Sequence, residues 1–202
     1  MYEIPTKVNI GGTEYQIRNN GDYRMVLDCF GALQDASLNS NERLFCSLII
    51  FYEDINCIAD INKFENLQEA VDKMFEFFNC GQSQSVGKKM RHKLIDWEQD
   101  SQIICSAINK VANKEVRAEP YIHWWTFMGY YSAVGESLLS TIVTIRNKIV
   151  TGKKLEKHER TFKLENPEFF VWNANSIVDD EAEELFKQLW NNAEGGDIDG
   201  EG

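Results

Sequence analysis

The chain has 202 residues, of which 43% are hydrophobic; this suffices for one domain with a buried core and argues against wholesale disorder. It contains no run of 18 apolar residues and no N-terminal basic stretch followed by an apolar one. We therefore expect neither a membrane span nor a secretory signal. The formal net charge of −11 is uneven, because residues 179–202 alone carry nine acidic residues and one lysine.

A β-hairpin is predicted over residues 4–18. Apolar and polar residues alternate on both sides of the Gly11-Gly12 pair, as in half-buried strands. The two glycines provide the positive φ angles that a two-residue turn needs. Because an isolated hairpin is marginally stable in water, we expect it to pack on helices or to pair with another chain. If the hairpin pairs with another copy of this chain, the protein is a homo-oligomer.

Helices are predicted to follow the hairpin. Asp22 is a suitable N-cap for the first of them, and the polar run at residues 39–41 separates it from a second element over residues 44–55. Asn66 is placed to cap a third helix, with Glu69 three residues later as in a capping box. This third helix has the cleanest apolar stripe in the chain: Leu67, Val71, Met74, Phe75 and Phe78.

Gly81 is well placed to end the third helix, and residues 82–89 are predicted to form a mobile loop. Residues 94–112 are predicted to form the next helix, with Trp97 facing inward. Asp96 and Asp100 lie one helical turn apart on it, and we expect a solvated acidic face rather than a magnesium site.

An aromatic segment dominates the middle of the chain, with six aromatic residues between positions 119 and 131. Apolar residues continue at helical spacing to Ile149, and Pro120 suits a first helical turn. We therefore expect one long helix, or two helices that meet near Gly135. So many rings need a partner surface, which is either the core of the protein itself or a binding partner.

The C-terminal part is charged. Residues 146–163 carry seven basic and two acidic residues, and residues 153–164 are predicted to be helical. This face can be solvated, contact phosphates, or dock an acidic protein, for which the acidic end of the same chain is one candidate. A short apolar cluster at residues 168–172 precedes a last predicted helix, residues 179–190, capped by Asp179.

The predicted fold is therefore mainly α: a helical bundle with a small N-terminal β-hairpin. We expect one helical domain over residues 1–192, with a subdivision near residues 82–90 as an option. Residues 193–202 are expected to be a disordered acidic tail.

No catalytic constellation is evident. The three histidines are isolated from one another, and no nucleotide-binding motif occurs. The cysteines form no C-x-x-C pair, so we expect reduced, buried thiols rather than a zinc site or disulfides. We expect no enzyme activity, no cofactor and no metal. The residues concerned are His92, His123 and His158, and Cys29, Cys46, Cys57, Cys80 and Cys105.

Three segments together resemble a known family of phage proteins: residues 96–100 (DWEQD), residues 120–127 (PYIHWWTF), and residues 146–155. The family is encoded between the major tail protein and the tape-measure protein of long-tailed phages, and its members are regarded as tail-assembly chaperones. The resemblance covers residues 4–172. It implies a protein that binds the helical tape-measure protein and promotes assembly of tail-tube subunits in the host cytoplasm, and that is absent from the mature virion.

On this reading, the aromatic segment would grip an apolar helix of the client. The predicted partner-binding residues are Tyr121, Trp124, Trp125, Met128 and Tyr131. The predicted partners are the tape-measure protein and the major tail protein. The alternative is a structural component of the tail or connector that stays in the virion, and a nucleic-acid-binding role is weaker than either.

Overall fold

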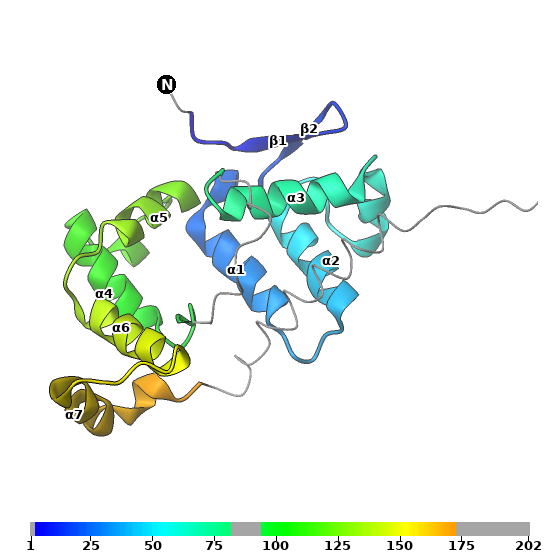
Figure 1. The fold of residues 1–202 in the computed structure, drawn as a ribbon. Helices are drawn as coiled ribbons and strands as arrows, with labels where there is room; N and C mark the ends of the chain where they lie inside the picture. Colours follow the sequence, from blue (N-terminus) through cyan, green and yellow to red (C-terminus); the bar gives the residue numbers. More distant parts are fainter. Residues whose placement is uncertain (1–2, 82–93, 173–202) are drawn as a thin grey trace, which may run out of the picture.

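The computed structural model describes residues 3–81 and 94–172 and shows a mainly helical fold with one small β-hairpin (Figure 1). This confirms the predicted fold class. The hairpin pairs β1 (Lys7–Ile10) with β2 (Thr13–Gln16). The α-helices are α1 (Tyr23–Leu33), α2 (Ser40–Phe51), α3 (Leu67–Phe78), α4 (Ser101–Ala112), α5 (Trp124–Ser132), α6 (Leu138–Val150) and α7 (Lys157–Glu165). Short 3-10 helices are η1 (Arg18–Gly21), η2 (Ile58–Lys63), η3 (Val116–Ala118) and η4 (Pro167–Phe170).

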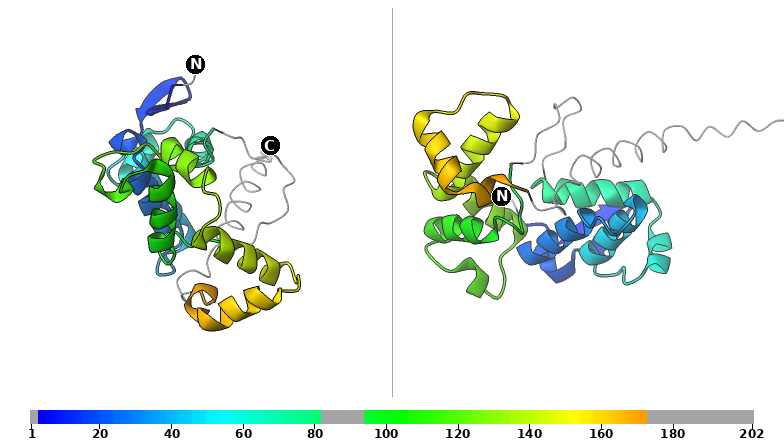
Figure 2. Two further views of the ribbon diagram at one scale, coloured as in Figure 1. Left: turned by 90° about the vertical axis from the view of Figure 1, so that its left-hand side faces the viewer. Right: turned by 90° about the horizontal axis from the view of Figure 1, so that it is seen from below.

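The helices form two groups that meet at α1. In Figure 1, α1 and α2 lie side by side, α3 crosses their ends, and the hairpin lies beyond α3. Helices α4 and α5 pack together, and α5 also contacts α1, so one hydrophobic core runs from Ile10 to Leu139. Helices α6 and α7 lie next to each other at the end of the molecule opposite the hairpin (Figure 2). None of the helices in the described ranges has the length and apolar character that a bilayer crossing requires.

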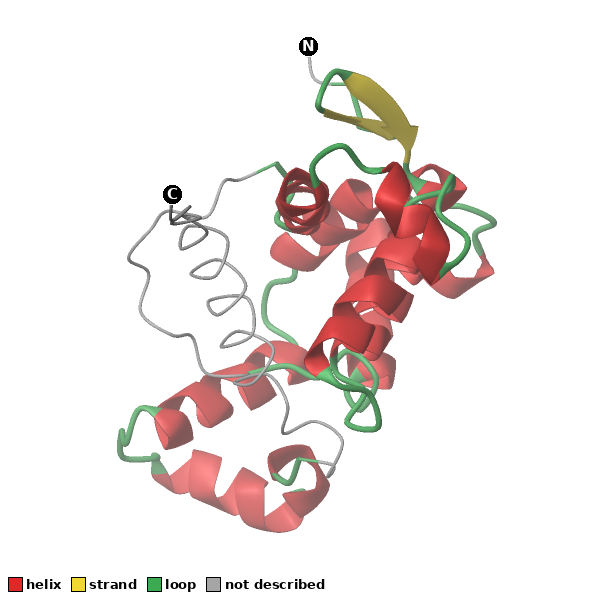
Figure 3. Ribbon diagram, turned by 90° about the vertical axis from the view of Figure 1, so that its right-hand side faces the viewer, coloured by secondary structure: helices red, strands yellow, loops and turns green. Residues whose placement is uncertain are grey.

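The hairpin forms as predicted and is seen in yellow at one end of the molecule in Figure 3. It packs on α3. Gly11 and Gly12 have φ angles of 59° and 92°, which is the left-handed geometry of the turn. The Gly11 N–H donates to the Glu69 carboxylate at 3.0 Å. Because the side chain of Ile10 is fully buried, the hairpin is part of the core and not an appendage.

The predicted N-caps of α1 and α3 are confirmed. Asp22 accepts the Arg24 N–H, and Asn66 accepts the Glu69 N–H. The reciprocal half of the predicted capping box does not form, because the Glu69 carboxylate binds the hairpin turn instead. After α3, Gly81 has a φ of 76° and ends the helix as expected.

Helix α4 starts at Ser101, seven residues later than predicted. The preceding segment turns around Asp96, whose carboxylate accepts the N–H groups of Glu98 and Gln99 at 2.9 and 2.7 Å. The predicted solvated acidic face is wrong, since Asp96 and Asp100 are 6% and 2% exposed. Asp100 is buried because its carboxylate binds a buried arginine, described below.

The aromatic segment forms two helices, α5 and α6, separated at residues 133–137. Helix α5 begins at Trp124 rather than just after Pro120. Residues before it are extended because Ile122 pairs with the start of α1: its N–H donates to the Asp22 carboxylate at 3.0 Å, and its carbonyl accepts the Tyr23 N–H at 2.9 Å. Tyr121 therefore lies outside the helix.

Several predictions fall outside the described residues. These are the loop and subdivision at residues 82–90, the last helix at residues 179–190 and the acidic tail at residues 193–202. The predicted charged helix over residues 153–164 is observed as α7, which begins four residues later, at Lys157.

Candidate functional site

The adjacent tryptophans at the start of α5 bind the C-terminal end of α3. The Trp124 indole N–H donates to the Phe78 carbonyl at 2.9 Å, and the Trp125 indole N–H donates to the Phe77 carbonyl at 2.9 Å. Carbonyls in the last turn of a helix have no partner within the helix. The Trp-Trp pair therefore caps α3 and joins the two helix groups.

The same contacts remove Trp124 from the predicted partner-binding surface. Its side chain is 1% exposed and packs against the rings of Phe30 and Trp97, with centroid distances of 5.8 Å in both cases. A partner cannot reach this ring without opening the core. Trp125, Met128 and Tyr131 are half-buried against that core, and Tyr121 is 45% exposed with its hydroxyl donating to the Asn20 carbonyl.

His123 has a structural role as the N-cap of α5. Its Nδ1 accepts the Trp125 N–H at 3.1 Å, so Nε2 carries the proton and donates to the Pro5 carbonyl at 3.0 Å. Both ring nitrogens are thus engaged by backbone groups. Burial lowers the pKa of His123 below its ordinary value of 6.5.

We expect the free energy of unfolding to decrease as the pH falls below about 6.5. The folded state keeps His123 neutral, whereas the unfolded chain takes up its proton first, so protons favour unfolding in this range. Hydrogen bonds from Lys63 and Arg117 lower the pKa of Asp60 and of Glu115 to about 2. Protonation of these carboxylates therefore affects stability only at more acidic pH than that of His123.

Urea unfolding at a series of pH values checks this expectation. The matched variant is His123→Asn, because asparagine also caps helices but does not titrate. Its unfolding free energy should change less between about pH 5.5 and 7.5 than that of the wild type. Equal slopes in the two proteins would show that His123 is not the group responsible.

No group of three His, Cys, Asp or Glu side chains in the described ranges is close enough to hold a metal ion. Burial raises the pKa values of the Cys29, Cys80 and Cys105 thiols, which disfavours their nucleophilic thiolate forms. All five cysteines are free, but Cys57 is exposed rather than buried.

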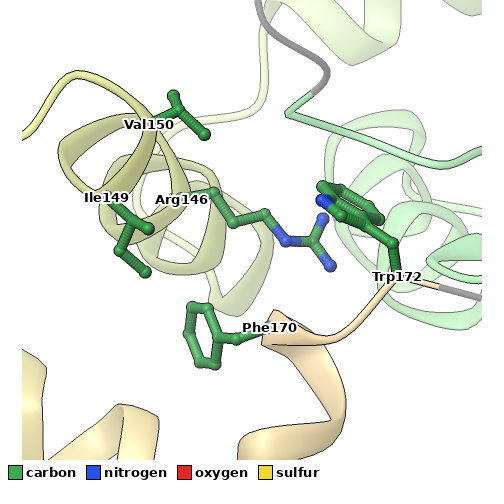
Figure 4. Close-up of a pocket in the computed structure, with 5 residues that line it drawn as sticks. All are labelled: Arg146, Ile149, Val150, Phe170 and Trp172. Atoms are coloured by element: carbon green, nitrogen blue, oxygen red, sulfur yellow. The ribbon is translucent and has the colours of Figure 1, made fainter. Parts of the chain in front are cut away.

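A shallow apolar hollow of about 50 Å³ opens between α6 and the chain from the end of η4 to Trp172 (Figure 4). It is lined by Arg146, Ile149, Val150, Phe170 and Trp172. Ile149 and Val150 are 39% and 37% exposed, and nearby Val171 is 67% exposed. We take this hollow as the candidate binding surface, because its apolar side chains are exposed next to one another. The sequence contained the apolar cluster 168–172, but not its position against α6.

A buried arginine holds the two walls of this hollow together. The Arg146 guanidinium binds both oxygens of the Asp100 carboxylate at 2.5 and 3.0 Å, and it donates to the Phe169 carbonyl at 2.8 Å. Its Cζ lies 4.2 Å from the centre of the Trp172 ring, a cation–π distance. This ion pair also joins two of the segments that carry the family resemblance, residues 96–100 and 146–155.

Basic side chains are concentrated in residues 153–160, which follow α6 and lead into α7. The acidic residues of this region are already engaged, because Lys148 of α6 binds the carboxylates of Glu156 and Glu159 at 3.7 and 2.6 Å. The hydrogen bond from Lys148 lowers the pKa of Glu159. Four exposed basic residues of this segment have no acidic partner in the described part of the chain: Lys153, Lys154, Lys157 and Arg160.

Comparison with known proteins gives one match. A family model described as "Bacteriophage Gp15 protein" matches residues 1–166, from the hairpin through α7. No curated protein and no solved structure matches the chain. The matched residues include Asp100, Arg146 and the Trp-Trp pair, and they end just before η4.

Proposed function

The chain belongs to the bacteriophage Gp15 protein family, and from this premise we propose that it is a tail-assembly chaperone for the tape-measure protein. It binds an apolar helical segment of that client in the host cytoplasm and keeps the client soluble. It promotes assembly of the major tail protein into the tube around the client. It performs no catalysis, uses no cofactor, and leaves before the virion matures.

The observation that supports this proposal most directly is the exposed apolar hollow at α6. A helical client presents its apolar residues as a stripe, and a shallow groove lined by aliphatic and aromatic side chains accommodates such a stripe. Ile149 and Val150 lie on one wall and Trp172 on the other. We therefore place the main client contact here rather than at the buried Trp124.

Co-expression with the tape-measure protein tests the proposal. The client should be largely insoluble alone and soluble with this chain, and Ile149→Glu should weaken the complex roughly 10-fold or more, as expected when an isoleucine contact is lost. Ile58→Glu is the matched control, because Ile58 is 61% exposed but lies in η2, far along the chain from the hollow. Solubility that is unchanged by co-expression would contradict the chaperone role.

The alternative is a structural tail or connector protein. The two roles differ in where the chain is found: a structural component remains in purified virions, whereas a chaperone is found only in infected-cell extracts. Quantitative mass spectrometry of purified particles separates them. Several copies per virion would favour the structural role.

A further inference from the structure

We infer that residues 179–190 of this chain dock on the hollow and its basic rim, and so occupy the client surface until a client displaces them. The docking is a property of this chain alone. Only its regulatory meaning, competition with a client, rests on the proposed function.

The apolar pattern of this segment matches what the hollow exposes. Residues 179–190 carry apolar side chains at helical spacing: Ala182, Leu185, Phe186, Leu189 and Trp190. A stripe of this kind needs an apolar surface to cover it. In the described ranges, the wall formed by Ile149 and Val150 is such a surface, because these residues are 39% and 37% exposed.

The chain between the hollow and residues 179–190 is long enough to let this segment reach the hollow. The described chain reaches the hollow at Trp172, which is one of its lining residues, and six residues separate Trp172 from Asp179. The seven Cα-to-Cα steps from Trp172 to Asp179 span up to roughly 25 Å when extended. A helix of 12 residues is roughly 18 Å long, and α6, with 13 residues, is of similar length. The segment can therefore fold back along α6 toward α7.

The charges are complementary. Residues 179–190 carry five acidic residues and one lysine, a net charge of −4. The basic rim, residues 153–160, follows the α6 wall of the hollow in the chain and carries Lys153, Lys154, Lys157 and Arg160, which are exposed and have no acidic partners in the described ranges. Opposite potentials select a docking partner and its orientation. The chain's own acidic segment brings this complementarity at high effective concentration, because it is tethered beside the site.

Photo-cross-linking of the full chain, without any client, tests the docking. Benzoylphenylalanine replaces Leu189 on the apolar stripe in one protein and Gln188, off the stripe, in a control. Irradiation of the dilute protein at position 189 should give cross-links within one chain to residues 146–154 or 168–172. Cross-links to other regions, cross-links only between chains, or equal yields at positions 188 and 189 would overturn the docking.

A second measurement addresses the competition. In full-length protein, Leu189→Glu should tighten binding of a tape-measure peptide by roughly 5- to 10-fold if the segment covers the hollow about 80–90% of the time. Gln188→Glu adds the same charge off the stripe and should have little effect. If the cross-links form but no tape-measure peptide binds the wild type or the Leu189→Glu variant, the docking stands and the proposed function fails. If the peptide binds both variants equally, the competition is wrong.

Discussion

Replacing Trp124 by alanine should lower the free energy of unfolding by roughly 3–5 kcal/mol, the usual range for a large aromatic residue in a core. The ring is 1% exposed, and its indole N–H caps α3 through the Phe78 carbonyl. The substitution leaves a cavity between the two helix groups and an unpaired carbonyl at the end of α3. Urea unfolding followed by circular dichroism measures the change, which should appear as a lower midpoint with a similar slope.

Trp125→Ala is the matched control for this prediction. Trp125 makes the same kind of hydrogen bond, to the Phe77 carbonyl at 2.9 Å, but its ring is only partly buried. We expect Trp125→Ala to lower the free energy of unfolding clearly less than Trp124→Ala does. If the two variants lost equal stability, the hydrogen bonds to α3 rather than ring burial would dominate. A loss below about 1 kcal/mol for Trp124→Ala would contradict the core assignment.

These tryptophans show where sequence reasoning reaches its limit. Helical spacing identifies which positions share an apolar face, but it does not identify what covers that face. The residue that was expected to contact a partner, Trp124, is covered by Phe30 and Trp97 from other segments. Those contacts, and the indole hydrogen bonds to α3, depend on tertiary packing between residues about 46 positions apart.

Turns and helix caps, in contrast, were predictable because they depend on contacts within a few residues of the chain. The Gly11-Gly12 turn and the Asp22 and Asn66 caps depend on backbone groups a few residues away, and all three appear as expected. The burial of Asp100 at the start of α4 was not predictable, because its carboxylate binds a distant arginine. Asp100 and Arg146 are 46 residues apart, and nothing in either local sequence indicates the pair.

Removal of either member of the Asp100–Arg146 pair should destabilise the protein by roughly 3–5 kcal/mol, because the partner is left as an uncompensated buried charge. The two side chains are 1% and 4% exposed. Asp100→Ala leaves the guanidinium without its carboxylate, and Arg146→Met leaves the carboxylate without its cation. In contrast, Glu14→Ala breaks the exposed Lys7–Glu14 pair and should cost less than about 1 kcal/mol.

A double-mutant cycle distinguishes a true pair from two independent losses. Once both charges are gone, no uncompensated charge remains, so the double variant should be more stable than the sum of the single losses predicts, by roughly 1–3 kcal/mol. Arg146 also binds the Phe169 carbonyl and lies over Trp172, so Arg146→Met should loosen the segment after η4 more than Asp100→Ala does. Hydrogen exchange at residues 167–172 measures this difference. Additive losses would mean that the ion pair does not couple α4 to α6, and equal exchange in both single variants would mean that Arg146 does not hold the wall of the hollow.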